Sequence, residues 1–253
     1  MRMVFGEYNV ATLTIIAVAF LLGGFSKGGV GFGLPLIAMP IMANVISIPL
    51  AIGLMSIPIL ASNTWQAFAS GHHVAMFRRF WTLILALAIT TGLAAQILTR
   101  VDQVAISIFT GVLVALFVLS QAFSLRISVT EKTEARMKPV IGILSGFLGG
   151  ISGIFGPPLL SFLVALKMPK EEFMCAVGLI YLTGIFPLFG TLIASGVIST
   201  ADGWVSLAAC APLSIGVLLG AWMRSRVSQT VFQRVVLFML FIVALNLIRR
   251  GFI

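Results

Sequence analysis

The chain has 253 residues, of which 60% are hydrophobic and 9% are charged, and its mean hydropathy is +1.15. Soluble globular domains carry about a quarter charged residues and about half apolar ones. Because about 20 consecutive apolar residues cross a bilayer as one helix, the long apolar runs leave little chain for any soluble domain. The composition therefore excludes a soluble globular protein and predicts an all-α polytopic membrane protein.

The formal net charge is +9, from 16 Lys and Arg against 7 Asp and Glu. Nucleic-acid binding needs basic residues gathered on one folded face, whereas these are scattered singly between apolar segments. We therefore interpret them as positive-inside signals that orient a membrane protein, with no nucleic acid as partner. The two cysteines, Cys175 and Cys210, lie in apolar stretches. They are expected to be packing residues, and the sequence suggests no metal and no cofactor.

The amino terminus is similar to a secretory signal, since Arg2 precedes the apolar stretch from Val10 to Leu22 and the small residues Gly23 and Gly24. The same Leu-Gly-Gly feature recurs in the second half of the chain, where no signal peptide could lie. We therefore expect this segment to remain in the mature protein.

Eight apolar segments follow one another along the chain, four in each half, and the first segment of each half is interrupted by glycines and prolines. In the first half they run over Val10–Ile46, Ile48–Ala69, Phe80–Leu98 and Val104–Phe123, and in the second over Val140–Leu166, Phe173–Ala194, Trp204–Met223 and Val231–Ile248.

Polar landmarks recur in the two halves in the same order and at nearly constant separation. Leu22-Gly23-Gly24-Phe25-Ser26 matches Leu148-Gly149-Gly150-Ile151-Ser152 at an offset of 126, and Arg100-Val101-Asp102-Gln103 matches Arg226-Val227-Ser228-Gln229 at the same offset. Such order is hard to obtain by chance and indicates a tandem duplication. The expected organisation is a first membrane repeat over 1–123, a polar linker over 124–139 and a second repeat over 140–253.

The basic residues discriminate between two topologies of the repeats. If all eight segments cross once, the repeats are parallel and the basic residues divide nine to six between the two sides. If the interrupted first segments fold back or form hairpins, the repeats are inverted and the division is 11 to 4. The larger asymmetry favours two homologous four-segment repeats in inverted orientation.

Two glycine-rich breaks occupy corresponding places in the halves. The first reads GGFSKGGVGFG over 23–33 and is followed by Pro35, and the second reads GGISGIFGPP over 149–158. Paired interruptions of this kind are the sequence pointer to a transporter's binding site, because broken helices expose backbone N–H groups at membrane depth. Each unsatisfied group in hydrocarbon costs several kcal/mol, so the breaks should be buried or line a polar cavity. Close helix packing is the alternative reading of these glycines.

Lys27 is the only basic residue placed inside such a break, and no acidic residue lies within an apolar segment. A buried ammonium requires a counter-charge, a carbonyl cage or an anionic ligand, so the partner of Lys27 could be the substrate. The alternative is a lysine that snorkels to the interface. We predict a small oxyanion site between the two breaks, to which the glycines contribute free backbone N–H groups. Its expected residues are Ser26, Lys27, Gly28, Gly29, Ser152, Gly153 and Pro157.

Other polar residues give weaker signals. Asn63 and Gln66 could line the same cavity, or could form hydrogen bonds between helices, and Tyr181 is roughly their counterpart in the second half. His72 and His73 follow the end of the second segment, where they form either an ordinary loop pair or a proton-sensing gate.

The chain resembles the sulfite exporter TauE/SafE family. The resemblance rests on the run from Gly23 to Gly31 with Pro35 after it, and on the second-half run from Gly149 to Pro158. It implies a multi-pass transporter of small sulfur-containing anions, such as sulfite or organosulfonates, usually directed outward across the bacterial inner membrane. The second run has Gly153 opposite Lys27, so a two-fold symmetric pair of charges is not expected.

The main hypothesis is therefore a secondary transporter, most simply an exporter, that works by alternating access. Its expected partners are a small anion and the lipid bilayer, and the sequence leaves open whether it forms a homo-oligomer. An anion channel is the second hypothesis. A membrane-embedded enzyme or assembly factor of sulfur metabolism is the third. The sequence has no HExxH or Ser/His/Asp set for it, and no spacing joins Cys175 and Cys210 to the His pair. The absence of a GxxxxGK[ST] run argues against transport driven by nucleotide hydrolysis. No catalytic residue is predicted.

Overall fold

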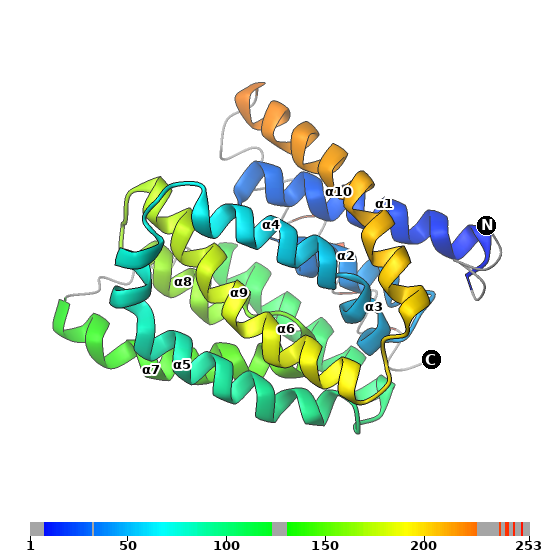
Figure 1. Cartoon of the computed structure of the whole chain (residues 1–253), viewed down its shortest axis with the longest axis horizontal. Helices are drawn as coiled ribbons and strands as arrows, with labels where there is room; N and C mark the ends of the chain where they lie inside the picture. The colour runs from blue at the N-terminus through cyan, green and yellow to red at the C-terminus, as the bar shows by residue number, and fades with distance from the viewer. Residues whose placement is uncertain are drawn as a thin grey trace. The chain divides into compact units, whose positions relative to one another are not determined.

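The computed structural model describes residues 8–31, 33–122 and 131–226, together with five single residues between 238 and 249. These residues form helices and connecting turns with no strand, as the composition predicts (Figure 1). The helices are α1 (Val10–Val30), α2 (Leu34–Met42), α3 (Ile48–Leu54), α4 (Ser56–Phe68), α5 (His73–Leu98), α6 (Gln103–Ala122), α7 (Glu131–Ser152), α8 (Gly156–Ala165), α9 (Lys170–Ala194) and α10 (Thr200–Arg226).

Among the described residues, four helices are long and apolar enough to cross a membrane, and a fifth span is possible if α3 and α4 form one. The four are the spans Val10–Gly29, His73–Leu98, Lys170–Ala194 and Thr200–Met223. Helices α3 and α4 are bent by 47° at their junction, where the backbone N–H of Ile57 donates to the Oγ of Ser206 at 3.1 Å. The prediction of a polytopic membrane protein is confirmed.

The expected segments correspond to helices with three differences. Each interrupted first segment is two helices, α1 with α2 and α7 with α8, and the second segment is divided into α3 and α4. The expected linker is also partly helical, because α7 already begins at Glu131. The expected segment Val231–Ile248 falls almost wholly outside the described residues.

The helices group into two compact units that do not follow the sequence halves. Unit 1 comprises Met1–Pro58, Val101–Phe123 and Gly196–Ile253, and unit 2 comprises Ile59–Arg100 and Ser124–Ser195. Each unit therefore combines helices from both halves of the chain. The tandem duplication is a statement about sequence and stays a prediction.

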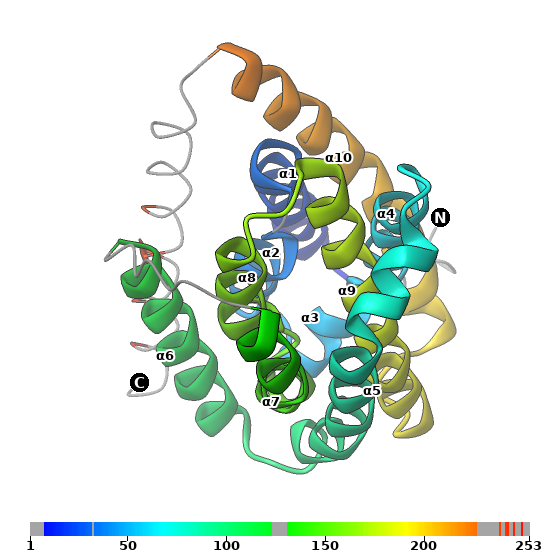
Figure 2. The same cartoon turned by 90° about the vertical axis from the view of Figure 1, so that its left-hand side faces the viewer.

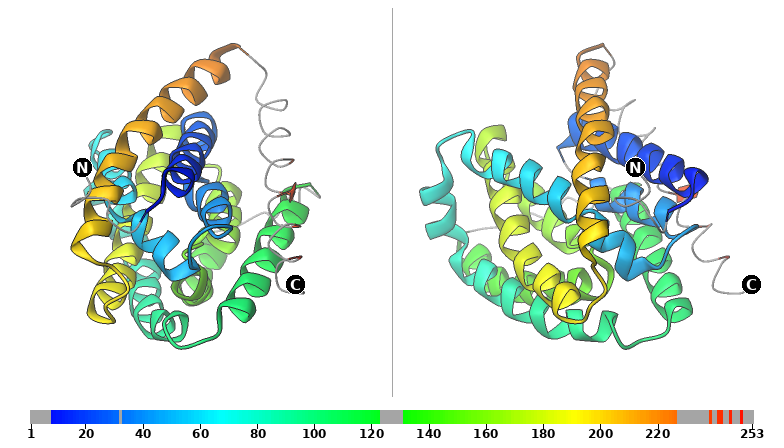
Figure 3. Two further views of the ribbon diagram at one scale, coloured as in Figure 1. Left: turned by 90° about the vertical axis from the view of Figure 1, so that its right-hand side faces the viewer. Right: turned by 45° about the vertical axis from the view of Figure 1, so that its right-hand side comes forward.

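In unit 1, α1 and α10 pack closely through glycines on both helices (Figures 1 and 3). A Cβ atom at Gly24 would lie 2.4 Å from the carbonyl oxygen of Leu213, and one turn later a Cβ at Gly28 would lie 2.1 Å from that of Val217. Gly220 approaches the carbonyl of Phe25 in the same way. The contacts advance together along both helices, so α1 and α10 run parallel, and small residues allow their backbones to meet.

In unit 2, α5 and α7 form a second parallel pair, side by side in Figure 2. Cβ atoms at Gly142 and Gly146 would each lie 2.5 Å from a carbonyl oxygen of α5, that of Leu83 and that of Leu87 respectively. Gly150 continues the row one turn later against Thr91. In each unit the first helix of one half thus packs along the helix of the third apolar segment of the other half.

Polar contacts join the amino-terminal ends of the first pair. The hydroxyl of Tyr8, just before α1, donates to a carboxylate oxygen of Asp202 in the first turn of α10. Asp202 also accepts from the backbone N–H of Ser199 at 2.7 Å, while its own N–H donates to the Ser199 hydroxyl at 3.3 Å. This reciprocal capping box satisfies N–H groups at the start of α10 and fixes where the helix begins.

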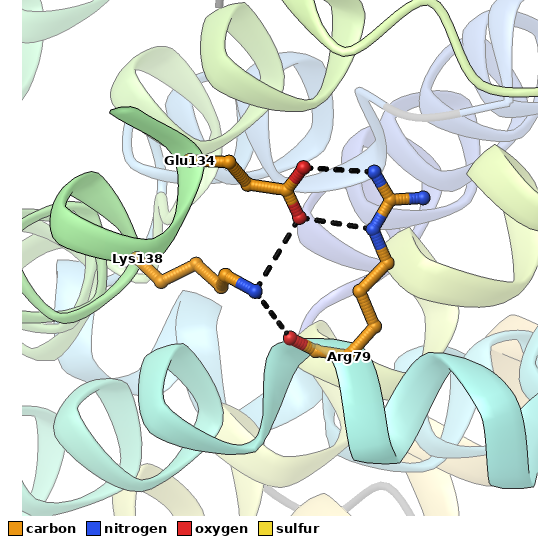
Figure 4. Close-up of polar contacts among 3 residues, drawn as sticks. All are labelled: Arg79, Glu134 and Lys138. Atoms are coloured by element: carbon orange, nitrogen blue, oxygen red, sulfur yellow. Dashed lines mark hydrogen bonds and ion pairs between the residues drawn. The ribbon is translucent and has the colours of Figure 1, made fainter. Parts of the chain in front are cut away.

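The second pair is joined by charge (Figure 4). The guanidinium of Arg79 on α5 donates two hydrogen bonds of 2.9 Å to the carboxylate of Glu134 on α7, and Lys138 donates to the carbonyl of Arg79 at 2.7 Å. The hydrogen bond from Arg79, together with the charges of Arg79 and Lys138, lowers the pKa of Glu134, although partial burial acts in the opposite direction. The expected linker therefore anchors α7 to α5.

Candidate functional site

The first break is a tight reversal between α1 and α2. Gly31 ends α1 with φ 90°, and its N–H donates to the carbonyl of Lys27 at 2.8 Å. Gly33 precedes α2 with φ 105°, and Pro35 lies in the first turn of that helix. Both φ values are in the region that glycine adopts without strain, which explains why a run of glycines stands here.

Helix α2 folds back along α1. A Cβ atom at Gly33 would lie 2.5 Å from the Oγ of Ser26, and one at Gly23 would lie 3.1 Å from the carbonyl oxygen of Leu34 and 3.2 Å from the Cβ of Ala38. Ser26 is fully buried in this turn. The interrupted segment is therefore a helical hairpin, which is the condition under which the sequence predicts inverted repeats.

Lys27 lies in the last turn of α1, next to the break, and is half-buried within the span Val10–Gly29. A cation in the last turn of a helix interacts favourably with the partial negative charge of that end. The side chain that the sequence places inside the break thus belongs to the helix that leads into it.

The expectation that Gly28 and Gly29 offer free N–H groups is wrong. Both lie inside α1, whose helical hydrogen bonds use those groups, and Gly28 is required where α1 meets the backbone of Val217. Helix packing, the alternative that the sequence left open, accounts for Gly28. The nearest amino-terminal helix end at this break is that of α2, which no side chain caps.

The second break is also a reversal. Ser152, the last residue of α7, is fully buried, donates to the carbonyl of Leu148 at 2.7 Å and accepts from the N–H of Ile154 at 3.2 Å. Gly153 has φ 71°, and its N–H donates to the carbonyl of Gly149 at 2.8 Å. The N–H of Gly153 is therefore occupied as well, because α7 extends its hydrogen bonding to this residue.

Helix α8 begins inside the second break with Gly156, Pro157 and Pro158, and no side chain caps its first turn. The ring of Phe155 lies against Gly149, where a Cβ would be 2.1 Å from it, and against Gly184 of α9 at 2.9 Å. The two glycines leave room for this ring. Pro157 is thus in the first turn of α8, as expected for a residue of the break.

Tyr181 of α9 also reaches this break. Its ring centroid is 5.9 Å from that of Phe155, and its hydroxyl is 3.2 Å from the position that a Cβ would take at Gly156. The sequence indicated Tyr181 only as the counterpart of Asn63 and Gln66. Its approach to the break depends on the packing of α9 against α8, which no spacing in the sequence reveals.

Asn63 and Gln66 lie on the face of α4 that packs against α9, and both are buried. Gln66 donates to the sulfur of Met174 at 3.8 Å, and Gly178 lets the backbone at Asn63 approach closely. The sulfur of Cys175 donates to the carbonyl of Ala67 at 3.1 Å in the same contact. The structure thus shows Asn63 and Gln66 in a contact between helices of unit 2, which is one of the two interpretations that the sequence allowed.

His72 and His73 lie at the start of α5. The Nδ1 atoms of both rings are buried and form no hydrogen bond with the described residues, and the His73 ring is 4.9 Å from that of Phe68. In an ordinary solvated loop, the ring nitrogens of both histidines would be exposed to water. The gate reading of this pair stays a prediction.

The predicted site residues thus divide between the units. Ser26, Lys27, Gly28 and Gly29 belong to unit 1, and the remaining ones belong to unit 2, so one shared site stays a prediction. Within the described ranges, no group of three or more His, Cys, Asp or Glu side chains could hold a metal ion.

Comparison with known proteins gives one match, to the family described as sulfite exporter TauE/SafE, over residues 15–247. No curated protein and no solved structure matches the chain. The matched range covers both glycine-rich breaks, three of the four spans that the structure describes, and the first span from residue 15 onward. The chain therefore belongs to the sulfite exporter TauE/SafE family and is a membrane transporter of the sulfite exporter type.

Proposed function

We propose that the protein exports small sulfur-containing anions, such as sulfite or organosulfonates, across the bacterial inner membrane as a secondary transporter. The observation that carries this proposal is the pair of uncapped half-helices, α2 and α8, each of which begins inside a glycine-rich break. Family membership over residues 15–247 supports the same substrate class.

The amino-terminal end of a helix carries about half a positive charge, which favours an anion at that point. At the first break this end, that of α2, is one tight turn from Ser26 and Lys27. The ammonium of Lys27 supplies a full charge, and a hydroxyl supplies a donor. Such a set suits a compact oxyanion of low charge, and it discriminates poorly between sulfite and a sulfonate, which present the same oxygens.

Transport by alternating access needs bodies that keep their shape while they move. Each unit contains a parallel helix pair in which glycines bring two backbones together, so we assign the units, rather than the sequence halves, as the moving bodies. The chain passes from one unit to the other at 58/59, 100/101, 123/124 and 195/196. The crossings at 100/101 and 195/196, which lie in turns between helices, are the proposed hinges, and Gly196, with φ 71°, is at one of them.

The test is flux in proteoliposomes with sulfite, sulfate, thiosulfate, sulfoacetate and acetate, each at two pH values. The proposal predicts transport of sulfite or sulfoacetate with little transport of acetate, and equal flux of all five anions would contradict it. Counterflow separates the mechanisms, because a carrier shows transient uphill exchange and a channel does not.

The enzyme hypothesis has a separate test. The thiol candidates are Cys175 and Cys210. Cys175 donates to the carbonyl of Ala67 where α9 meets α4, and Cys210 donates to the carbonyl of Ser206 within α10. Replacing both with Ala should leave the flux of sulfite within about twofold of the original value, as expected for packing residues.

A further inference from the structure

Tyr181 has an unusual place on α9. This helix is the most buried of the candidate spans, and its lipid-exposed side is marked by Phe186 and Ile193, which are 60% and 62% exposed. Tyr181 lies on the opposite side, in line with Ile185 and Leu188, one and two turns later, which are 3% and 1% exposed. Tyr181 nevertheless keeps accessible surface. That surface therefore belongs to the buried side of α9 and not to the side that would face lipid.

The hydroxyl of Tyr181 forms no hydrogen bond with the described residues. It is the nearest polar side-chain atom to the position of a Cβ at Gly156, the first residue of α8, at 3.2 Å. A phenol hydroxyl usually forms a hydrogen bond, and one that keeps accessible surface without a partner in the protein is open to water or to a ligand. This donor is therefore available to a ligand at the start of α8.

The first turn of α8 lacks donors that other helices have. Its second and third residues are Pro157 and Pro158, and proline has no backbone N–H. A ligand at this helix end thus meets the favourable dipole with fewer N–H groups to bind its oxygens. The hydroxyl of Tyr181 supplies a donor at the place where the backbone offers fewest.

We infer that Tyr181 is a substrate-binding residue, whose hydroxyl donates a hydrogen bond to an oxygen of the transported oxyanion at the second break. This inference rests on the proposed function and names a contact for it. Because the second break has no counterpart of Lys27, an anion there would be bound by neutral donors and the helix dipole.

The test is the substitution Tyr181→Phe, which keeps the ring against Phe155 and removes only the hydroxyl. The expected result is a KM for sulfite about tenfold higher, the loss of one hydrogen bond to a charged group, with the unfolding temperature unchanged. Thr183→Val is the matched control. Thr183 lies two residues after Tyr181 on the same helix, and its hydroxyl donates to the carbonyl of Ile180 at 2.9 Å, so the KM of this variant should not change.

A second measurement reads the hydroxyl directly. The chain has two tyrosines, so in a Tyr8→Phe variant labelled with 3-fluorotyrosine the single ¹⁹F signal reports on Tyr181. Saturating sulfite should shift this signal, and chloride at equal ionic strength should not.

The outcomes separate the two proposals. Sulfite flux with an unchanged KM in Tyr181→Phe and an unshifted ¹⁹F signal would overturn the role of Tyr181 and leave the proposed function standing. Absence of sulfite and sulfonate flux in the unsubstituted protein would overturn the proposed function. In that case a ¹⁹F shift with another oxyanion of the panel would still support Tyr181 as a residue that contacts an anion. The absence of a shift with every anion of the panel would overturn that role as well.

Discussion

Ser26 and Gly33 meet across the first break so closely that no side chain fits at position 33. A Cβ atom there would lie 2.5 Å from the Oγ of Ser26, and the backbone of Gly33 has φ 105°. Two separate costs therefore oppose any substitution, a steric one and a conformational one. The reversal that brings the start of α2 beside Ser26 and Lys27 depends on this glycine.

Gly33→Ala should lower the stability of the protein markedly. The conformational cost of a left-handed residue other than glycine is about 1–2 kcal/mol, and overpacking adds about 1–3 kcal/mol. In the double variant Gly33→Ala with Ser26→Ala the steric part should be relieved, since the clashing atom is removed. Thermal unfolding of the purified protein in detergent measures both, and strictly additive losses would show that the two residues do not meet as described.

Gly28→Ala tests the packing of α1 on α10. The new methyl group would lie 2.1 Å from the carbonyl oxygen of Val217, so the helices must separate. We expect a loss of about 1–3 kcal/mol, which lowers Tm by roughly 5 °C.

The matched control for that change is Gly203→Ala, in the first turns of α10, where nothing lies within 4 Å of the added methyl. Alanine is the better helix former by about 1 kcal/mol, so this variant should be at least as stable as the original. Equal destabilisation by both changes would contradict the close parallel pairing.

Glu134→Gln tests the contact between α5 and α7. The carboxylate accepts two hydrogen bonds from Arg79, and its lowered pKa means that the folded state favours the charged form. The stabilisation is therefore complete at neutral pH and is lost as the pH falls through the lowered pKa of the folded state. At pH 7 the variant should unfold at a temperature lower by roughly 5 °C, from a loss of about 2 kcal/mol.

The pH dependence of Tm in the original protein and in Glu134→Gln is the control for this prediction. As the pH falls toward and below the ordinary range of a glutamate, the original protein should lose its advantage and the two Tm values should converge. A difference that stays constant from pH 7 to pH 3 would show that the charge of Glu134 does not stabilise the fold.

The sequence was sufficient to predict the membrane class, the helical segments within the described residues and the two breaks, because hydropathy and glycine content are local properties. It could not predict which helices pair. The glycines at 142, 146 and 150 are spaced for close packing, yet only the fold shows that their partner is α5. Nor could it predict the helical start at Glu131, since charged residues there were interpreted as a linker.

The site itself stays a prediction, and one chemical detail of it was wrong. The position of Ser26 and Lys27 beside a broken helix follows from the run of glycines around them. The N–H groups of Gly28 and Gly153, expected to be free, are used within α1 and by the carbonyl of Gly149, because both helices continue farther into the breaks than their composition suggests. The contact of Tyr181 with the second break depends on tertiary packing alone.

The central claim is that the first break binds the transported anion through Lys27. It is tested most directly by the rate of sulfite flux into proteoliposomes that contain equal amounts of the original protein, Lys27→Ala and Lys27→Arg, each with its unfolding temperature measured. We predict that Lys27→Ala abolishes sulfite flux while the protein remains folded, and that Lys27→Arg, which keeps the charge in a larger side chain, transports at an intermediate rate. Sulfite flux at the original rate in folded Lys27→Ala would contradict the account.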